Sequence, residues 1–240
     1  MPKLDFNQLR AVDSLSSLVG YLRDQLCWPI DDYEPDDLTF EWAADTLRVS
    51  EDKAAVLSGG QIRQLRSMVP NQPWGIFLVE FNDDRVHSGL LREILRGLVT
   101  NRRHDPHLPS WQHDNLLFIC ATRDYKRITL AHFRGEKFQK ARLTTFGWQR
   151  ENPYMRTLAE FNLPALVWPD NPDDSDGWLK SWTAAFDKEP ITRDFFKRFD
   201  KALLAIKADL ETLQNFTSAE AYSRAQLLLE RMIFLYFLQN

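Results

Sequence analysis

The stretch from Trp74 to Thr122 constrains the fold more than any other part of the chain. It begins with the continuous apolar run "GIFLVEF", passes into "GLLREILRGLV" with apolar residues at helical spacing, and ends in a second apolar run, "NLLFICAT". Short continuous apolar runs are typical of strands that are covered on both faces, so this order predicts strand, helix, strand. The helix then packs across a mixed β-sheet, and the predicted fold class is α/β (α+β) with flanking helices.

Weaker patterns extend this core in both directions. An amphipathic helix is predicted over residues 7–26, a short strand from Leu38 and a short helix over Ile62 to Met68. After the core, "RITLAHFRG" and "KARLTTFGW" alternate between apolar and polar residues, which predicts an antiparallel meander. A helix near Tyr154 to Phe161 and a strand "ALVW" at 165–168 complete this part of the chain.

A change in composition divides the chain into domains. The segment "PDNPDDSDG", residues 169–177, combines prolines, aspartates and a glycine, which is typical of a linker. We therefore predict an α/β domain over residues 1–168, a linker over 169–190 and a helical connector over 191–240. The connector carries two helical patterns, and Thr217 with Glu220 forms a capping-box pattern before the second, so a helical hairpin is expected.

The final helix, "LLLERMIFLYFLQN", is apolar nearly all round. Such a helix needs burial from more sides than one hairpin supplies. We therefore expect the 240 residues to come from a longer chain, whose next domain covers Phe234, Tyr236 and Phe237. Self-association through residues 218–240 is the alternative.

Composition limits the class of protein. The chain is 44% hydrophobic and 27% charged, which is ordinary for a globular protein. It shows no secretion signal and no apolar run near the roughly 18 residues of a membrane span, so we predict a cytoplasmic protein without membrane contact. Cys27 and Cys120 lie far apart in apolar settings, and both are predicted to be buried thiols rather than disulfide or zinc ligands.

The net charge of −4 conceals an uneven distribution. Between Arg85 and Arg150 there are 13 Lys and Arg against 5 Asp and Glu, a net charge of +8. A polarised distribution favours a polyanionic partner such as DNA, and a solvated basic face is the alternative. The candidates for contacts with DNA phosphates follow one helix and two turns: Arg92, Arg96, Arg102, Arg103, Lys126, Arg127 and Lys140. Contacts of this kind predict weak, strongly salt-dependent binding that does not read bases.

Several stretches resemble a known group of proteins. The segments "PWGIFLVEF", "LLFICATRDYKRITLAHFR", "ITRDFFKRFDKALLAI" and above all "LLLERMIFLYFLQN" resemble the N-terminal region of large fused restriction-modification enzymes and related phage-defence methyltransferases. The resemblance runs from Trp74 to Asn240. It implies a nuclease or nuclease-like domain, then a helical connector, then a site-specific DNA adenine methyltransferase that uses S-adenosylmethionine.

The methyltransferase part of that family has no counterpart in these 240 residues. Neither an Asn-Pro-Pro-Tyr type sequence nor a glycine-rich cofactor loop occurs. We therefore expect no cofactor in this segment and no methylation by it. Its expected partners are DNA and a C-terminal methyltransferase domain of the same chain.

The resemblance also implies a fold of the PD-(D/E)xK nuclease type. In such nucleases an Asp and the Glu of the E-x-K strand bind a metal ion such as Mg²⁺, and the Lys positions or activates the attacking water. Glu80 is the candidate Glu and Asp36 the candidate Asp, as catalytic residues and metal ligands, although other acids compete with Asp36: Asp32, Asp37 and Glu41. Asn82 stands where the Lys belongs. Either Arg85 substitutes for that Lys or the site has decayed and only the fold remains, and we favour decay.

Other polar residues have simpler interpretations. Asp83 and Asp84 are expected to cap the following helix rather than bind a metal ion. His104, His107 and His113 are expected to be exposed loop residues. Three functions therefore stay open: a DNA-associated, degenerate nuclease-like domain of a restriction-modification-type methyltransferase; a protein-interaction module without DNA binding; and an active metal-dependent DNA endonuclease.

Overall fold

The computed structural model describes residues 5–30, 35–70, 72–102, 115–134, 142–153, 157–187 and 189–239, in places by their backbone alone. The chain divides into two compact units, Met1–Phe186 and Asp187–Asn240, which we call unit 1 and unit 2. The boundary between the units falls inside the range 169–190 that the sequence predicts as a linker.

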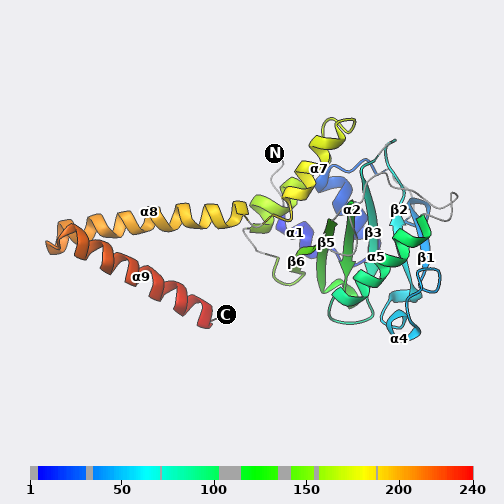
Figure 1. Ribbon diagram of the computed structural model, residues 1–240, viewed down its shortest axis with the longest axis horizontal. Coiled ribbons are helices and arrows are strands. Elements are labelled where there is room, and N and C mark those ends of the chain that lie inside the picture. The colour runs from blue at the N-terminus through cyan, green and yellow to red at the C-terminus, as the bar shows by residue number, and fades with distance from the viewer. Residues whose placement is uncertain are drawn as a thin grey trace. The chain divides into compact units, whose positions relative to one another are not determined.

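Unit 1 is built on a six-stranded sheet in the order β1-β2-β3-β4-β5-β6 (Figure 1). The strands are β1 (Thr39–Ala43), β2 (Gln61–Leu65), β3 (Trp74–Glu80), β4 (Asn115–Ala121), β5 (Arg127–Arg134) and β6 (Arg142–Gln149). β3 and β4, the two continuous apolar runs, pair in parallel, and the other neighbours pair antiparallel. The mixed sheet and its flanking helices confirm the predicted α/β class.

One face of the sheet is covered by α5 (Ser88–Arg102), which connects β3 to β4 in the chain and runs obliquely across the sheet (Figure 1). The apolar side chains of α5 are buried against alternate residues of the two parallel strands, such as Phe77 and Phe118. Gly97 permits a close approach, because a Cβ atom there would lie 2.3 Å from the carbonyl oxygen of Leu47. Side-chain alternation along the strands thus divides the core into two layers.

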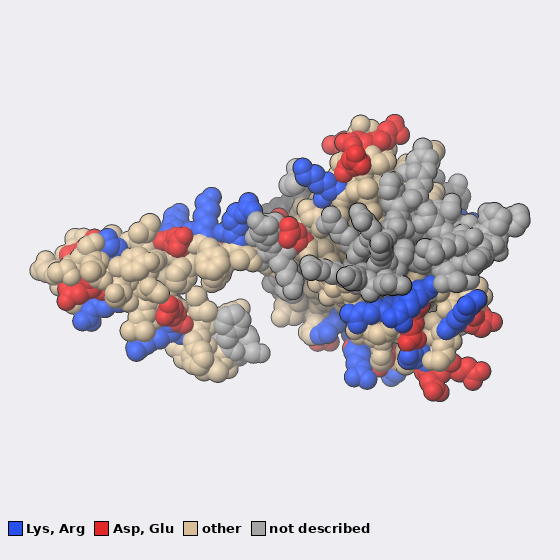
Figure 2. All heavy atoms as spheres, in the orientation of Figure 1, with Lys and Arg blue, Asp and Glu red and all other residues tan. Residues whose placement is uncertain are grey.

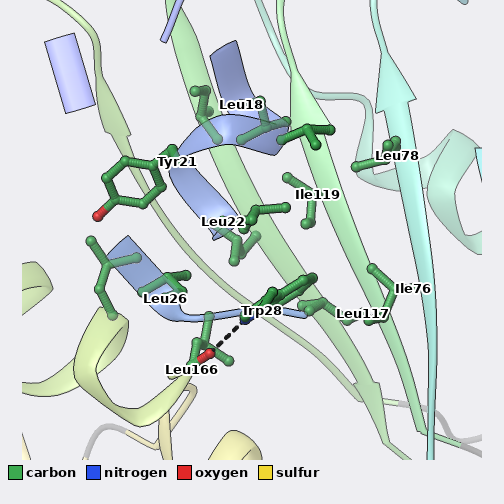
Figure 3. Close-up of a cluster of buried hydrophobic side chains, with 14 of the residues drawn as sticks. Leu18, Tyr21, Leu22, Leu26, Trp28, Ile76, Leu78, Leu117, Ile119 and Leu166 are labelled. Carbon is green, nitrogen blue, oxygen red and sulfur yellow. Dashed lines mark hydrogen bonds between the residues drawn. The ribbon is translucent and has the colours of Figure 1, made fainter. Parts of the chain in front are cut away.

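The other face packs against α1 (Phe6–Ala11) and α2 (Leu15–Leu26). Figure 3 shows Leu22 of α2 near Ile119 on β4, while the ring of Trp28 lies beside Leu117 and Ile76 on β4 and β3. Trp28 follows α2, and its Nε1 donates a hydrogen bond to the carbonyl oxygen of Leu166 at 2.9 Å (Figure 3). This bond satisfies the polar atom of a fully buried ring and fixes the chain after α2.

A tryptophan cluster extends this second layer. α7 (Ser175–Ala184) carries Trp178 and Trp182, one helical turn apart and both buried. Trp182 stacks on Trp28 with ring centroids 4.9 Å apart, and Trp168 contacts both tryptophans of α7 edge-on. Part of the predicted linker is therefore a helix that contributes to the core of unit 1.

Several local predictions differ from the structure. Residues 61–65 form β2, so the helix expected over Ile62 to Met68 is wrong. The helix expected over 7–26 is interrupted, because Ser14 starts α2 afresh with a capping box to Ser17. The strand expected at 165–168 is also wrong, since the chain there leaves a helical turn. The remaining short helices are α3 (Pro35–Leu38), α4 (Glu51–Ala54), η1 (Ser58–Gly60), η2 (Arg123–Tyr125), the π-helical η4 (Leu158–Asn162) and α6 (Leu163–Ala165).

The two cysteines differ in environment. Cys120 on β4 is buried as predicted, and burial raises the pKa of its thiol. Cys27 is exposed, so the prediction of a buried thiol is wrong there. It terminates α2 in the left-handed backbone conformation, with φ 56°, which turns the chain toward Trp28.

Unit 2 is the predicted helical hairpin, formed by α8 (Glu189–Gln214) and α9 (Ser218–Gln239). The capping box is confirmed: the Thr217 amide donates to Glu220 Oε2 at 3.1 Å, and the Glu220 amide donates to Thr217 Oγ1 at 3.4 Å. None of the helices in the described part of the chain combines the length and apolar character that crossing a bilayer requires. Unit 2 nevertheless exposes many large apolar side chains: Phe195, Phe196, Leu204, Leu213, Tyr222, Leu227, Leu228, Met232, Phe234, Leu235, Tyr236 and Leu238.

Candidate functional site

The candidate site lies where the two parallel strands of unit 1 end. Glu80 is the last residue of β3 and pairs in register with Ala121, the last residue of β4. In open α/β sheets, ligands bind at the carboxyl ends of parallel strands, because the loops that follow converge there. Here those loops are residues 81–87 and 122–126, and both are rich in charged side chains.

Glu80 is half-buried, and both of its carboxylate oxygens have partners. Arg63 Nη1 donates to Oε2 at 2.9 Å, and the Tyr125 hydroxyl donates to Oε1 at 2.7 Å. Arg63 comes from β2, where it pairs with Leu78, so alternation brings it to the same face of the sheet as Glu80. The carboxylate therefore already has a cation and a hydroxyl donor from within the chain.

The hydrogen bond from Tyr125 is stable against ionisation of the phenol. Burial is the main cause that raises the pKa of Tyr125, and the hydrogen bond to Glu80 raises it further. The phenol consequently keeps its proton at neutral pH and donates a hydrogen bond to the carboxylate. Tyr125 is a positioning group for Glu80 in this arrangement, not an acid or base.

A second carboxylate approaches the same guanidinium. Glu41 on β1 lies directly across from Arg63, with its Oε1 3.6 Å from Arg63 Nε, and it also accepts a hydrogen bond from Gln61. Of the acids that compete with Asp36, Glu41 is thus connected to Glu80 through Arg63. The three side chains form an acid–base–acid row across three neighbouring strands.

The other candidate acids have different surroundings. Asp37 lines a cavity of about 580 Å³ with Leu65 and Met68, at the opposite end of the sheet from Glu80. Asp32 and the side chain of Asp36 lie outside the described residues. Within the part of the chain that the structure describes, no three His, Cys, Asp or Glu side chains gather as a metal site would require.

Asn82, which stands at the expected lysine position, holds the chain in place. Its side-chain amide donates to the carbonyl oxygen of Leu57 at 3.0 Å, and its backbone amide donates to the carbonyl oxygen of Val56 at 2.8 Å. The guanidinium of Arg123 in turn donates to the carbonyl oxygen of Asn82. Asn82 therefore ties the end of β3 to two other loops.

Arg85 pairs with Asp83 at 3.5 Å and is largely exposed. The cation beside Glu80 is therefore Arg63, a residue that the sequence did not single out. The start of α5 also corrects the prediction that Asp83 and Asp84 cap this helix. α5 begins at Ser88, four to five residues after the two aspartates, so Asp83 and Asp84 do not cap it.

Asp83 instead accepts a hydrogen bond from His87. The distance from His87 Nε2 to Asp83 Oδ2 is 2.7 Å, and this bond is the main cause that lowers the pKa of Asp83. The pair closes the loop between β3 and α5. The histidine was not distinguished by spacing or composition, because its partner is set by the shape of the loop.

The basic residues are only partly assembled. Arg92 and Arg96 lie one turn apart on the exposed side of α5. Arg127 starts β5 on the α5 face of the sheet, since the next residue, Ile128, belongs to the opposite layer. Lys126 is exposed and lies 3.8 Å from Asp84. The side chain of Arg102, and Arg103 and Lys140, lie outside the described residues.

Figure 2 shows how these charges are distributed on one face of the molecule. Lysine and arginine side chains gather at the end of unit 1 where α5 begins, and acidic side chains lie between them (Figures 1 and 2). Among the turns at this end, Arg150 also donates to the carbonyl oxygen of Asp124 at 3.0 Å. The surface is therefore a mixed one, in which the two arginines of α5 are the clearest basic pair.

Comparison of the chain with protein-family models, with curated proteins and with solved structures found no match.

Proposed function

We propose that unit 1 is a DNA-associated domain related to nucleases of the PD-(D/E)xK type, in which an internal ion pair has taken the place of the metal site. The observation that carries this proposal is the contact between Arg63 and Glu80 at 2.9 Å. The candidate catalytic carboxylate is present at the end of its strand, but a guanidinium neutralises it.

The surroundings of Glu80 do not fit a divalent cation. Mg²⁺ needs several oxygen ligands at short distance, and the charge on Arg63 opposes a second cation at the same carboxylate. The hydroxyl of Tyr125 also donates a hydrogen bond to the other carboxylate oxygen of Glu80. We therefore assign no metal-dependent step to unit 1, in agreement with the replacement of the expected lysine by Asn82.

Binding to DNA is proposed to use the α5 side of the sheet. Arg92 and Arg96 on α5, with Arg127 on β5, carry exposed positive charge on that side, whereas Arg63 and Glu80 lie on the other face. Contacts to phosphates from these residues would hold the duplex without reading its sequence. In this proposal the whole protein is a cytoplasmic restriction-modification-type adenine methyltransferase for phage defence, and S-adenosylmethionine binds to another part of a longer chain.

Charge reversal on α5 tests the binding proposal. We expect the double variant Arg92→Glu/Arg96→Glu to weaken binding to duplex DNA and to reduce the slope of log K against log salt by about two, because each arginine that neutralises a phosphate contributes roughly one to that slope. Fluorescence anisotropy with a labelled duplex over a range of KCl concentrations measures both quantities. The double variant Arg23→Glu/Lys180→Glu makes the same change in net charge on α2 and α7, and we expect it to bind like the wild type.

Two results would contradict DNA binding through α5. One is wild-type binding that does not weaken as salt rises, because phosphate contacts release counterions. The other is an equal loss of affinity in both double variants, which would reflect net charge rather than a surface. A wild-type protein with no affinity for DNA at low salt would favour the second function below.

The second candidate function is a protein-interaction module without DNA binding. It is favoured by the exposed apolar side chains of α8 and α9, since a solvent-exposed apolar surface of this extent is a feature of interaction sites. Under this alternative the charges around α5 are a solvated surface. The salt-dependent binding experiment distinguishes the two functions directly.

A further inference from the structure

The exposed apolar surface of the described residues is confined to unit 2. The large hydrophobic side chains that are at least 44% exposed all belong to α8 or α9, whereas those of unit 1 pack into its two core layers. Among the described residues, this exposure of large apolar side chains is thus a property of the hairpin and not of unit 1.

An apolar stripe runs along the inner side of each helix of the hairpin. On α9, Ala221 and Ala225 are fully buried against α8, and the same spacing of four and three residues continues through Leu228, Met232 and Leu235. On α8, the buried Leu203 is preceded by Phe196, two turns earlier. Near the turn the stripes cover each other. Figure 1 shows the two helices diverging from the turn, and there Phe196, Met232 and Leu235 are more than half exposed.

The outer side of α9 is apolar as well. Leu227, Phe234 and Leu238 repeat at intervals of seven and four residues, so they form a second stripe along α9. The charged residues Glu230 and Arg231 flank this stripe on its two sides, and Met232 lies on a different side of the helix. A helix with apolar stripes on two sides needs cover on two sides. Its own α8 can supply only one.

We propose that unit 2 dimerises with unit 2 of a second copy. The C-terminal half of each α9, far from the turn, lies in the open end of the other copy's hairpin. The chain itself supplies both parts of this contact: an open, apolar-lined hairpin and a helix that is apolar on two sides. The same surface serves on both copies, as a two-fold symmetric interface requires. Two such hairpins together make a four-helix bundle.

The size of the exposed surface is adequate for a stable dimer. Seven of the exposed apolar side chains belong to the proposed contact, and they are 47–67% exposed: Phe196, Leu227, Leu228, Met232, Phe234, Leu235 and Leu238. Since a fully buried aromatic side chain covers roughly 150–250 Å², seven half-exposed apolar side chains offer on the order of 700 Å² on each copy. A stable protein–protein interface buries about 800 Å² on each partner. The hairpin therefore carries enough apolar area for this association by itself.

Sedimentation velocity of the full chain, over roughly a hundredfold range of concentration, tests the proposal. We expect a limiting species of twice the chain mass of 28.2 kDa. Phe196→Glu and Leu235→Glu should each weaken the dimer by roughly 30-fold or more, because each places a charge at the centre of the contact. Leu204→Glu is the matched control: Leu204 is exposed to the same extent but lies away from the inner stripe of α8.

Circular dichroism shows whether the variants keep their helices, and exposed positions make that the expected result. A wild-type protein that is monomeric at every concentration would overturn the proposal. So would aggregates that grow without a limiting mass, or a chain that associates only with a different protein. An equal loss of association in Leu204→Glu would also overturn it, because the contact would then not follow the stripe.

Discussion

Replacing Trp182 by alanine is expected to lower the free energy of unfolding of unit 1 by about 3–5 kcal/mol, the usual range for removal of a buried tryptophan. The ring of Trp182 is fully buried, stacks on Trp28 and contacts Trp178 edge-on. Its Nε1 also donates to the carbonyl oxygen of Val167. Alanine would leave a large cavity where α7 meets α2 and the sheet. Urea denaturation followed by circular dichroism and fluorescence measures the loss.

Lys180→Ala is the control for this substitution. Lys180 is exposed on the same helix, and its replacement should change the free energy of unfolding by no more than about 0.5 kcal/mol. If the two variants were equally stable, α7 would not belong to the core of unit 1. The result would then favour the linker that the sequence predicts over residues 169–190.

Replacing Arg63 by alanine is expected to lower the free energy of unfolding by about 2–3 kcal/mol. This value lies between roughly 0–1 kcal/mol for an exposed ion pair and 3–5 kcal/mol for a buried pair that loses one partner. The side chains of Arg63 and Glu80 are 23% and 28% exposed, so their pair is closer to the buried case. The alanine variant leaves the carboxylate of Glu80 half-buried without its cation.

A double-mutant cycle isolates the pair from other effects of the substitution. Glu80→Gln removes the charge and keeps an oxygen that can accept the hydrogen bond from Tyr125. In the Arg63→Ala background it should therefore cost less than in the wild type, with a coupling of about 1 kcal/mol or more. Arg66→Ala, at an exposed arginine just after β2, is the control and should be nearly neutral. A coupling near zero would mean that the two side chains do not stabilise each other.

The central strands could be predicted from the sequence because their burial is complete. In β3 and β4 nearly every side chain is buried, so the apolar run itself marks the strand. The same argument fails for β2, "QIRQL", in which Gln64 is buried as the acceptor of a hydrogen bond from Trp42 Nε1. A buried glutamine and a half-buried arginine hide the alternation of a five-residue strand. Ile62 and Leu65 then fit a helix equally well.

The tryptophan cluster does not follow from local composition, for a different reason. The acidic segment before Ser175 has the composition of a linker, and Asp174 does begin a helix by accepting a hydrogen bond from Gly177. Trp178 and Trp182 follow at helical spacing and indicate a buried helix face. The average composition of the whole segment, which is dominated by Pro and Asp, conceals this pattern. Their partners, such as Trp28, lie far away in sequence.

Glu80 illustrates what local sequence can and cannot say about a site. Its place at the end of a buried strand follows from the pattern of residues 74–80. Its partners do not, because Arg63 belongs to a strand that was expected to be a helix and Tyr125 lies in a turn 45 residues further along the chain. Long-range contacts of this kind depend on strand order and register. The decayed-site interpretation therefore stays a prediction, and Arg63 gives it a physical cause.

A DNA cleavage assay with the purified chain tests the central claim most directly. With supercoiled plasmid as substrate, and with Mg²⁺ and Mn²⁺ supplied separately, we expect no cleavage above that of a Glu80→Ala variant prepared in parallel. The reason is that Glu80, the candidate catalytic carboxylate at the end of β3, is already neutralised by Arg63. Cleavage by the wild-type protein that depends on the metal and disappears in Glu80→Ala would contradict this claim and establish an active endonuclease.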